Sequence, residues 1–216
     1  PLAPLELTIE ANERIGAKGE IVQPLDEEEL KQSLTALSQQ GIEALTVSLM
    51  NAYANGAHVV RVRPIADGSF PSIPISISSE VVPEMYEYER TETTVVNSYI
   101  RPVVSTYIEN LEAELNRRMS GMQLHILRSD GGLASAQAAK EAPVNLLMSG
   151  PAGGVSGAVW VARQAGYTDL LTFDMGGTST DVALIQNGVA QTRRETRVAD
   201  ITCILYTSDA AYEAES

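Results

Sequence analysis

A buried strand between two helical segments is the feature of this sequence that most limits its fold. Residues 44–49 read Ala-Leu-Thr-Val-Ser-Leu, a largely apolar run typical of a strand buried on both faces. Before it, the acidic residues 26–29 favour a helix start, leucines recur at helical spacing, and Gly41 is expected to end the helix. After it come a helical stretch at 56–66 and an alternating strand at 73–77. This rhythm predicts an α/β layer architecture.

The composition is that of a globular protein and excludes several classes. Of 216 residues, 44% are hydrophobic and 20% are charged, which excludes wholesale disorder. The formal net charge of −13 argues against a nucleic-acid partner, because binding to phosphate backbones depends on Lys and Arg. No apolar stretch approaches the ~18 residues of a membrane span. With a single cysteine, Cys203, and no signal-peptide pattern, we expect a cytoplasmic piece of a longer protein.

The second half of the chain is predicted to begin with a long helix. Residues 91–119 carry apolar side chains at four-residue steps, and Pro102 should begin a new helix or kink the old one. This stripe is interpreted as core or subunit interface: Val95, Tyr99, Val103, Tyr107, Leu111 and Leu115. A strand at 122–127, a helix at 155–164 and strands at 170–173 and 181–185 follow.

The turn between the last two strands has the composition of a phosphate-binding hairpin. An apolar strand delivers Asp174, Gly176 and Gly177 make a tight turn, and the second strand leaves with Asp181. Glycine has no β-carbon, so its N–H groups can approach an anion closely. Three hydroxyl residues that can add donors are Thr178, Ser179 and Thr180. The two carboxylates would repel a bare phosphate, but they suit Mg²⁺ bound with phosphate and water.

A plain hairpin is the competing interpretation of this turn. An isolated Gly-Gly between strands is more often there for turn geometry, with nearby hydroxyls capping backbone groups. The two flanking aspartates and the three consecutive hydroxyls shift the balance towards phosphate binding.

Residues 174–185 resemble the second phosphate motif of the actin-like ATPase superfamily. Other motifs occur in the order found in the hydantoinase A / oxoprolinase family, which includes acetone carboxylase β-type subunits. These motifs are residues 51–55 (Asn-Ala-Tyr-Ala-Asn), 79–84, 88–99, 129–133 and 149–155. The resemblance covers about residues 1–199, and so many ordered motifs make chance similarity improbable.

The resemblance implies an α/β, ribonuclease-H-like (actin-like ATPase) fold that is incomplete here, because the first phosphate loop and the adenosine loop are absent. It implies ATP-dependent opening of a cyclic amide, a hydantoin or oxoproline, through phosphorylation of the amide oxygen, with ATP and Mg²⁺ as cofactors. Asp174 and Asp181 would be catalytic and hold the metal. Cofactor-binding residues would be Gly176, Gly177, Thr178, Ser179, Thr180, Gly153 and Gly154. The implied partners are the cyclic amide, a hydantoinase B-type subunit or domain, and further copies in an oligomer.

Other segments and functions remain open alternatives. Residues 150–154 could offer N–H groups to an anion or simply permit close helix packing, and the packing interpretation is slightly favoured. Residues 129–132 could form a ligand loop or a plain turn. Glu80, Glu89 and Arg90 could line a substrate site, although a solvated loop is the safer expectation. The competing functions are an acetone-carboxylase-like β subunit and a non-catalytic or chaperone-like ATPase module.

The predicted organisation has four parts. Residues 1–25 form an extended entry segment, and 26–142 form the α/β part of the first lobe. Residues 143–199 contain a connecting helix and the start of the second ATPase lobe with its phosphate hairpin. Residues 200–216 are interpreted as a non-native tail, either loose or an opportunistic element.

Overall fold

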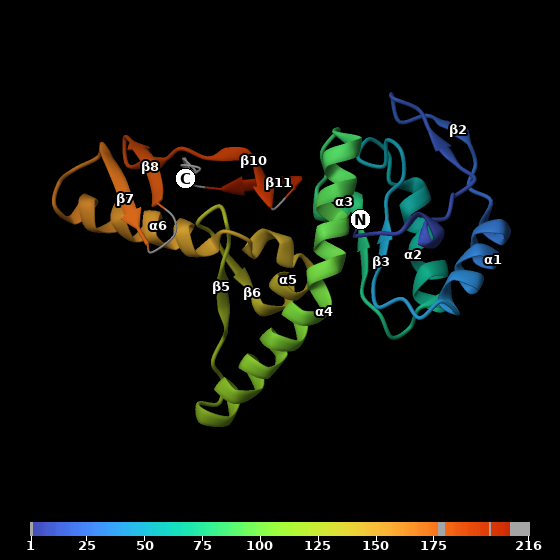
Figure 1. The fold of residues 1–216 in the computed structure, drawn as a ribbon, viewed down its shortest axis with the longest axis horizontal. Helices are drawn as coiled ribbons and strands as arrows, with labels where there is room; N and C mark the ends of the chain where they lie inside the picture. The colour runs from blue at the N-terminus through green and yellow to red at the C-terminus, as the bar shows by residue number, and fades with distance from the viewer. Residues whose placement is uncertain (1, 177–179, 199, 208–216) are drawn as a thin grey trace. The chain divides into compact units, whose positions relative to one another are not determined.

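The structure is a computed structural model that describes residues 2–176, 180–198 and 200–207 (Figure 1). It divides into an N-terminal unit, Pro1–Thr106, and a C-terminal unit, Tyr107–Ser216. The boundary falls within the long helix α4 (Glu87–Arg118). Both units combine helices with short strands, as an α/β fold requires.

The N-terminal unit is built on two parallel strands joined by a helix. β3 (Leu45–Val47) pairs in parallel with β4 (Ile75–Ile77), and α2 (Ala57–Ser69) is the crossover between them. α1 (Glu27–Ser38) packs on α2, and its buried leucines join the core. The shorter elements are a 3₁₀ helix at Leu5–Leu7, β1 (Arg14–Ile15), β2 (Ile21–Gln23) and α3 (Ser78–Val81). The βαβ unit predicted from the alternating pattern is confirmed.

The local signals for α1 act as predicted. The Asp26 side chain caps the helix by accepting a hydrogen bond from the Glu29 N–H at 3.0 Å. Leu30, Leu34 and Leu37 are buried on one face. Gly41 follows the helix with φ +68°, a left-handed conformation that costs glycine little.

Helix α4 differs from its prediction in two respects. It is continuous across Pro102, which therefore begins no new helix. Tyr99, Val103 and Tyr107 are 65%, 74% and 65% exposed, so this part of the apolar stripe is not core. Instead the helix buries a polar face that includes Arg90 and Asn97. The periodicity identified the helix correctly, and for these three residues the subunit-interface interpretation stays a prediction.

The C-terminal unit contains two hairpins, a helix–sheet pair and connecting helices. β5 (His125–Leu127) and β6 (Leu133–Ser135) form the first hairpin. α6 (Ser149–Gln164) packs on the antiparallel sheet β7-β8-β9. That sheet comprises β7 (Leu170–Met175), β8 (Thr180–Gln186) and β9 (Val189–Ala190). The remaining described elements are α5 (Ala136–Glu141), a 3₁₀ helix at Pro143–Leu146, β10 (Arg193–Val198) and β11 (Ile201–Thr207). Val155 of α6 packs with Ala183 and Ile185 of β8.

Residues 201–207 form strand β11 rather than a loose tail. β11 pairs with β10, and Cys203, Ile204 and Leu205 are each at most 3% exposed. Residues 208–216 lie outside the described part of the chain. Among the described residues, no helix combines the length and apolarity needed to cross a bilayer.

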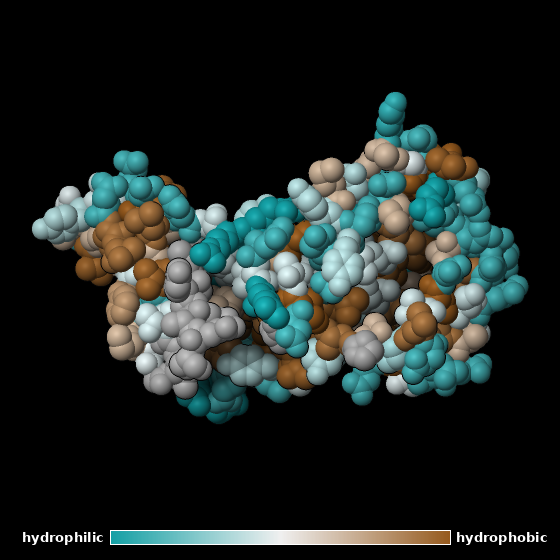
Figure 2. Space-filling model, turned by 45° about the horizontal axis from the view of Figure 1, so that its top comes forward, coloured by the Kyte–Doolittle hydropathy of each residue, from teal (hydrophilic) through white to brown (hydrophobic). Residues whose placement is uncertain are grey.

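One face of the β7–β8 pair is apolar and exposed. Leu171, Phe173 and Met175 alternate along β7 and are 63%, 62% and 67% exposed, because α6 packs on the opposite face. Hydrophobic residues gather at the left end of Figure 2, where Figure 1 places β7, β8 and α6.

Candidate phosphate-binding hairpin

The register of β7 and β8 places the two predicted aspartates directly opposite each other. Asp174 pairs with Asp181, and Met175 with Thr180, at the end of the ladder where the turn begins. Residues facing each other in an antiparallel pair project their side chains to the same face of the sheet. The two carboxylates are therefore neighbours, although six positions separate them along the chain.

These carboxylates lie on the face of the sheet that α6 covers. Ala183 and Ile185 are buried against α6, and Asp181 shares their face because strand side chains alternate. A β-carbon placed on Gly154 would be 3.9 Å from Asp174 Oδ2, so the carboxylate lies beside the α6 backbone. Asp174 is exposed and Asp181 half-buried. The pair thus lies at the open end of the helix–sheet layer, within reach of a ligand.

Two carboxylates placed opposite each other repel unless a cation lies between them. Within residues 2–176, 180–198 and 200–207, neither aspartate forms a salt bridge. The same described residues contain no group of three or more His, Cys, Asp or Glu able to hold a metal ion. An ion held by one or two carboxylates, with water and phosphate as the other ligands, is the usual arrangement for Mg²⁺. The donor set fits that ion better than Zn²⁺, which takes several protein ligands.

Of the other residues predicted at the turn, Gly176 and Thr180 flank it and are described. Gly177, Thr178 and Ser179 lie outside the described residues. Their phosphate contacts stay a prediction.

The glycines at 150–154 lie inside α6 rather than before it. The helix begins at Ser149, with Met148 at φ +64° preceding it and no side chain capping it. The amides of Gly153 and Gly154 therefore fall within the helical ladder, where N–H groups bond to carbonyls four residues earlier. A β-carbon on Gly153 would be only 2.6 Å from Leu127 Cδ2. This contact agrees with the close-packing interpretation, and a cofactor role for both glycines stays a prediction.

Replacing glycines of α6 by alanine separates packing from helix propensity. Gly157→Ala should stabilise the chain by about 0.5–1 kcal/mol, because its β-carbon meets no atom within 4 Å. Gly153→Ala should give a smaller gain or a loss, because its β-carbon displaces the Leu127 methyl group. Urea unfolding of both variants measures the difference. An equal gain at both positions would contradict the packing interpretation.

Residues 129–132 form the turn of the β5–β6 hairpin. Arg128 N–H bonds to Gly132 O at 2.8 Å, and Asp130 Oδ1 accepts from the Gly132 N–H at 2.9 Å. A β-carbon on Gly131 would be 2.8 Å from Ser156 Oγ of α6. These contacts account for the turn composition without a ligand.

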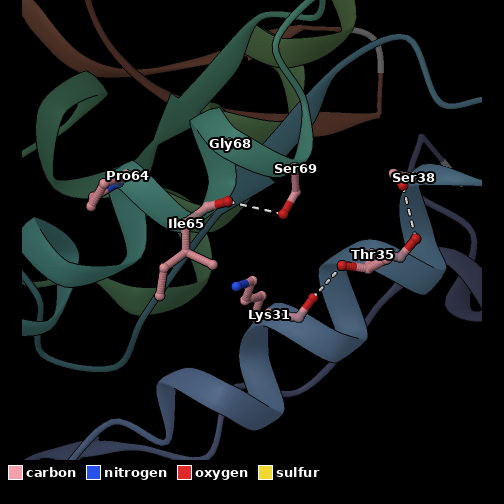
Figure 3. Close-up of a pocket in the computed structure, with 7 residues that line it drawn as sticks. All are labelled: Lys31, Thr35, Ser38, Pro64, Ile65, Gly68 and Ser69. Atoms are coloured by element: carbon pink, nitrogen blue, oxygen red, sulfur yellow. Dashed lines mark hydrogen bonds between the residues drawn. The ribbon is translucent and has the colours of Figure 1, made fainter.

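A surface groove elsewhere offers poorer ligand chemistry. It lies between α1 and α2 and is lined by Lys31, Thr35, Ser38, Pro64, Ile65, Gly68 and Ser69 (Figure 3). The three hydroxyls each donate to a carbonyl of their own helix, at 2.7–2.9 Å. The hydroxyls are therefore already engaged in contacts within their own helices and offer a ligand little.

The N-terminal unit contains two buried contacts of ionisable side chains that sequence reasoning missed. Arg90 is fully buried, whereas a solvated loop was expected there. His58 Nδ1 lies 2.5 Å from Glu13 Oε2, and both side chains are almost inaccessible. Glu80 is exposed and pairs with Arg63. Local spacing held no signal for the Glu13–His58 contact, because its partners are 45 residues apart.

Models of known protein families match most of this sequence. The sequence model described as Hydantoinase/oxoprolinase matches residues 90–210, and that of the Hydantoinase/oxoprolinase N-terminal region matches 1–69. The first match extends past residue 199, where the resemblance was expected to stop.

Relatives include the caprolactamase subunit alpha of Pseudomonas jessenii, 33% identical over 87% of this chain and 27% of that protein. 5-Oxoprolinase 1 of Arabidopsis thaliana is 33% identical over 85% of this chain and 14% of that protein. The acetone carboxylase beta subunit of Xanthobacter autotrophicus is 31% identical over 87% of this chain and 26% of that protein. The chain thus spans about a quarter or less of the length of these relatives.

Two solved structures share the fold. The ATP-dependent caprolactamase of Pseudomonas jessenii matches with a TM-score of 0.82 and 30% identity, over 91% of this chain and 28% of that one. The second is the nucleotide-free structure of acetone carboxylase, an enzyme of ATP-dependent acetone carboxylation. It matches with a TM-score of 0.78 and 28% identity, over 93% of this chain and 28% of that one. The predicted fold, an incomplete actin-like ATPase fold of the α/β class, is confirmed.

Proposed function

Because this chain belongs to the hydantoinase/oxoprolinase family, we propose that it supplies one phosphate-binding hairpin of an ATP-dependent enzyme that opens a cyclic amide. The substrate class is a hydantoin or an oxoproline-like lactam. Relatives named 5-oxoprolinase and caprolactamase support this class. ATP dependence is supported by both matching structures, an ATP-dependent caprolactamase and an acetone carboxylase of ATP-dependent carboxylation.

The observation that carries the proposal is the cross-strand pairing of Asp174 with Asp181. Asp174 and Asp181 would hold Mg²⁺ directly or through its waters, since their shared face brings both carboxylates to one place. The turn between them would contact phosphate oxygens through Gly176, Gly177, Thr178, Ser179 and Thr180. Gly154 of α6 lies beside this pair, since a β-carbon there would be in van der Waals contact with the Asp174 carboxylate.

ATP would supply a phosphoryl group for the amide oxygen, which makes the ring carbon susceptible to attack by water. The residues of this chain contribute charge neutralisation and positioning, which dominate phosphoryl transfer. The first phosphate loop of the family pattern, which would oppose this hairpin, does not occur in this sequence. We therefore expect little or no ATP hydrolysis by the 216-residue chain alone.

The test is phosphate release by the full-length protein with a substrate panel. Stimulation by hydantoins, 5-oxoproline or caprolactam, with ring-opened product, is the expected result. Turnover that requires bicarbonate and a ketone would instead support a carboxylase, the alternative suggested by the acetone carboxylase relative. Stimulation by peptides alone would indicate a chaperone-like module. Robust turnover by the 216-residue chain would contradict the need for an opposing phosphate loop.

Partners and location complete the proposal. Relatives named as alpha and beta subunits support assembly with other chains. We propose a hydantoinase B-type subunit or domain as that partner, within an oligomer. A cytoplasmic location is supported by the single cysteine, Cys203, which is buried. Co-expression with a candidate B-type chain and measurement of the complex mass tests this assignment.

A further inference from the structure

Three large side chains protrude from the N-terminal unit where α3 ends and α4 begins. Met85, Tyr86 and Tyr88 are 62%, 47% and 69% exposed, and we call them the Tyr–Met patch. Tyr and Met are enriched in protein interfaces relative to the remaining surface. All three lie within four consecutive residues, 85–88.

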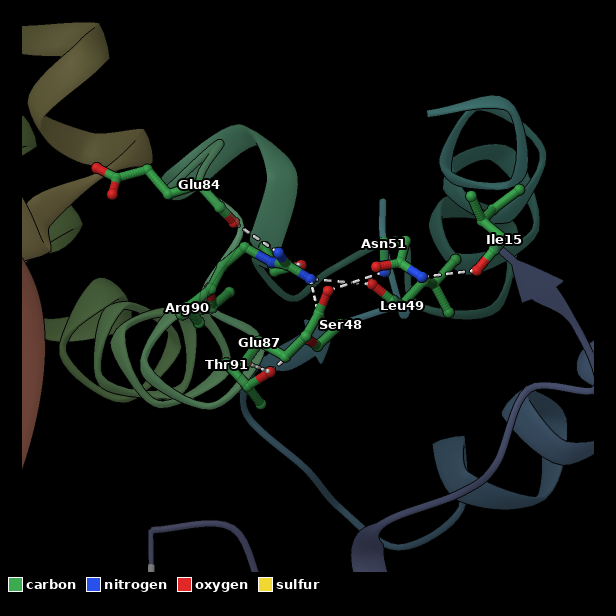
Figure 4. Close-up of polar contacts among 10 residues, drawn as sticks. Ile15, Ser48, Leu49, Asn51, Glu84, Glu87, Arg90 and Thr91 are labelled. Carbon is green, nitrogen blue, oxygen red and sulfur yellow. Dashed lines mark hydrogen bonds and ion pairs between the residues drawn. The ribbon is translucent and has the colours of Figure 1, made fainter. Parts of the chain in front are cut away.

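The backbone beneath this patch is held by buried contacts. The Arg90 guanidinium donates to Glu84 O at 2.6 Å and to Leu49 O at 3.2 Å, and it also pairs with Glu87 (Figure 4). Glu87 Oε1 accepts from the Asn51 N–H at 2.9 Å. The Arg90 side chain is fully buried. These contacts tie the segment to the loop after β3, so little conformational entropy would be lost when a partner binds the patch.

The chain around the patch is acidic. Residues 80–92 contain five Glu and one Arg. Two of the five are paired, Glu87 with the buried Arg90 and Glu80 with Arg63. Glu89 and Glu92 are half-buried and flank Tyr88 in sequence. The surface therefore combines aromatic faces with carboxylates, which is complementary to a cation that has an apolar stem.

The tyrosine at the centre of this surface is itself influenced by those carboxylates. A hydrogen bond from the Tyr88 hydroxyl to Glu92, with the negative charges of Glu92 and Glu89 and slight burial, raises the pKa of the phenol. The ring therefore stays neutral at physiological pH, and a carboxylate lies close to it. Cations are attracted to the faces of aromatic rings, more strongly where water is partly excluded.

We propose that the Tyr–Met patch docks a Lys- or Arg-bearing segment of a partner protein chain. A cationic head group binds over the tyrosine rings and pairs with Glu89 and Glu92. Its methylene stem packs on Met85, as long basic side chains commonly do on apolar surface. This role is independent of the phosphate hairpin, because every residue involved lies in the N-terminal unit.

The test uses the 216-residue chain and a fluorescently labelled peptide of alternating Arg and Leu, with a Glu–Leu peptide of equal length as probe control. We expect Tyr88→Ser and Met85→Ser each to weaken Arg–Leu binding about 5- to 10-fold in anisotropy titrations, the loss typical of an interface residue worth about 1 kcal/mol. Tyr88→Phe should retain affinity within about 2-fold because it keeps the ring. The double variant with Glu89→Gln and Glu92→Gln should bind the Arg–Leu peptide more weakly. Its affinity should also change less when salt is added.

Tyr99→Ser is the matched control, because Tyr99 is 65% exposed on the same helix outside the patch. It should leave peptide affinity unchanged. Equal losses in Tyr99→Ser and Tyr88→Ser would show that the peptide binds the acidic surface without a preferred place, and would overturn the proposal. Unchanged affinity in Tyr88→Ser and Met85→Ser, with circular dichroism confirming that both variants fold, would overturn it as well.

Discussion

Asp174→Asn and Asp181→Asn should each lower ATP hydrolysis by the full-length protein about 100-fold or more, the loss typical when one electrostatic stabiliser of a transition state is removed. The reason is the cross-strand geometry: each aspartate provides half of the negative charge that would hold Mg²⁺ against the phosphates. Steady-state phosphate release at saturating ATP measures the effect. Raising the Mg²⁺ concentration should restore part of the rate in each single variant.

A control and a second readout make this prediction specific. Asp67→Asn, an exposed carboxylate on α2, should retain the parent rate. In the 216-residue chain without nucleotide, removing one of two opposed carboxylates should leave the melting temperature unchanged or slightly higher, because like charges directly opposite are destabilising. Near-normal turnover in both aspartate variants would remove the pair from the site. Lower melting temperatures would instead indicate a structural role.

Arg90→Met should destabilise the N-terminal unit by about 3 kcal/mol, the low end of the cost of removing one partner from a buried ion pair, because the Glu87 side chain is 30% exposed. The change leaves the carbonyls of Leu49 and Glu84 without the donor that now satisfies them. It also leaves Glu87 without its cation. Urea unfolding followed by circular dichroism measures the loss. Hydrogen exchange should increase most in peptides covering residues 45–55 and 78–90.

Arg117→Met is the matched control, because α4 contains a second Arg–Glu pair with the same three-residue spacing. Arg117 Nη2 lies 2.7 Å from Glu114 Oε1, but the Arg117 side chain is 70% exposed. Exposed pairs contribute at most about 1 kcal/mol, so this variant should unfold near the parent midpoint. Similar shifts of the unfolding midpoint in the two variants would show that burial of Arg90 adds nothing to the stability of the pair.

The elements that sequence reasoning located correctly are those whose signals are local. Asp26 caps α1, and leucines at helical spacing face the core. The buried run at 44–49 contains β3, paired in parallel as the alternating pattern predicted. The hairpin strands flank the Gly-Gly turn. In each case the residues that determine the structure are within one or two turns, or one strand, of each other.

The features that local patterns left open or missed depend on contacts with other parts of the chain. The stripe of Tyr99, Val103 and Tyr107 has helical spacing, but spacing does not show which face of α4 the rest of the chain covers. Composition left the glycines at 150–154 open between anion binding and close packing, and the close approach of Leu127 to Gly153 in α6 agrees with packing. Arg90 was expected on a solvated loop. In the structure its guanidinium donates to the carbonyls of Glu84 and of Leu49, and Leu49 is 41 residues away along the chain.

The sequence by itself determined the α/β class, the positions of most longer helices and of the hairpin strands, the resemblance to the family and the identity of Asp174 and Asp181 as candidates. These follow from short-range periodicity, helix caps and the order of motifs, all of which can be read from the order of residues along the chain. Only the tertiary structure decided that the two aspartates face each other, that Gly154 lies beside Asp174, and that Arg90 is buried. Those facts depend on strand register and on which surfaces lose water when distant segments pack, and neither quantity is encoded by any local pattern.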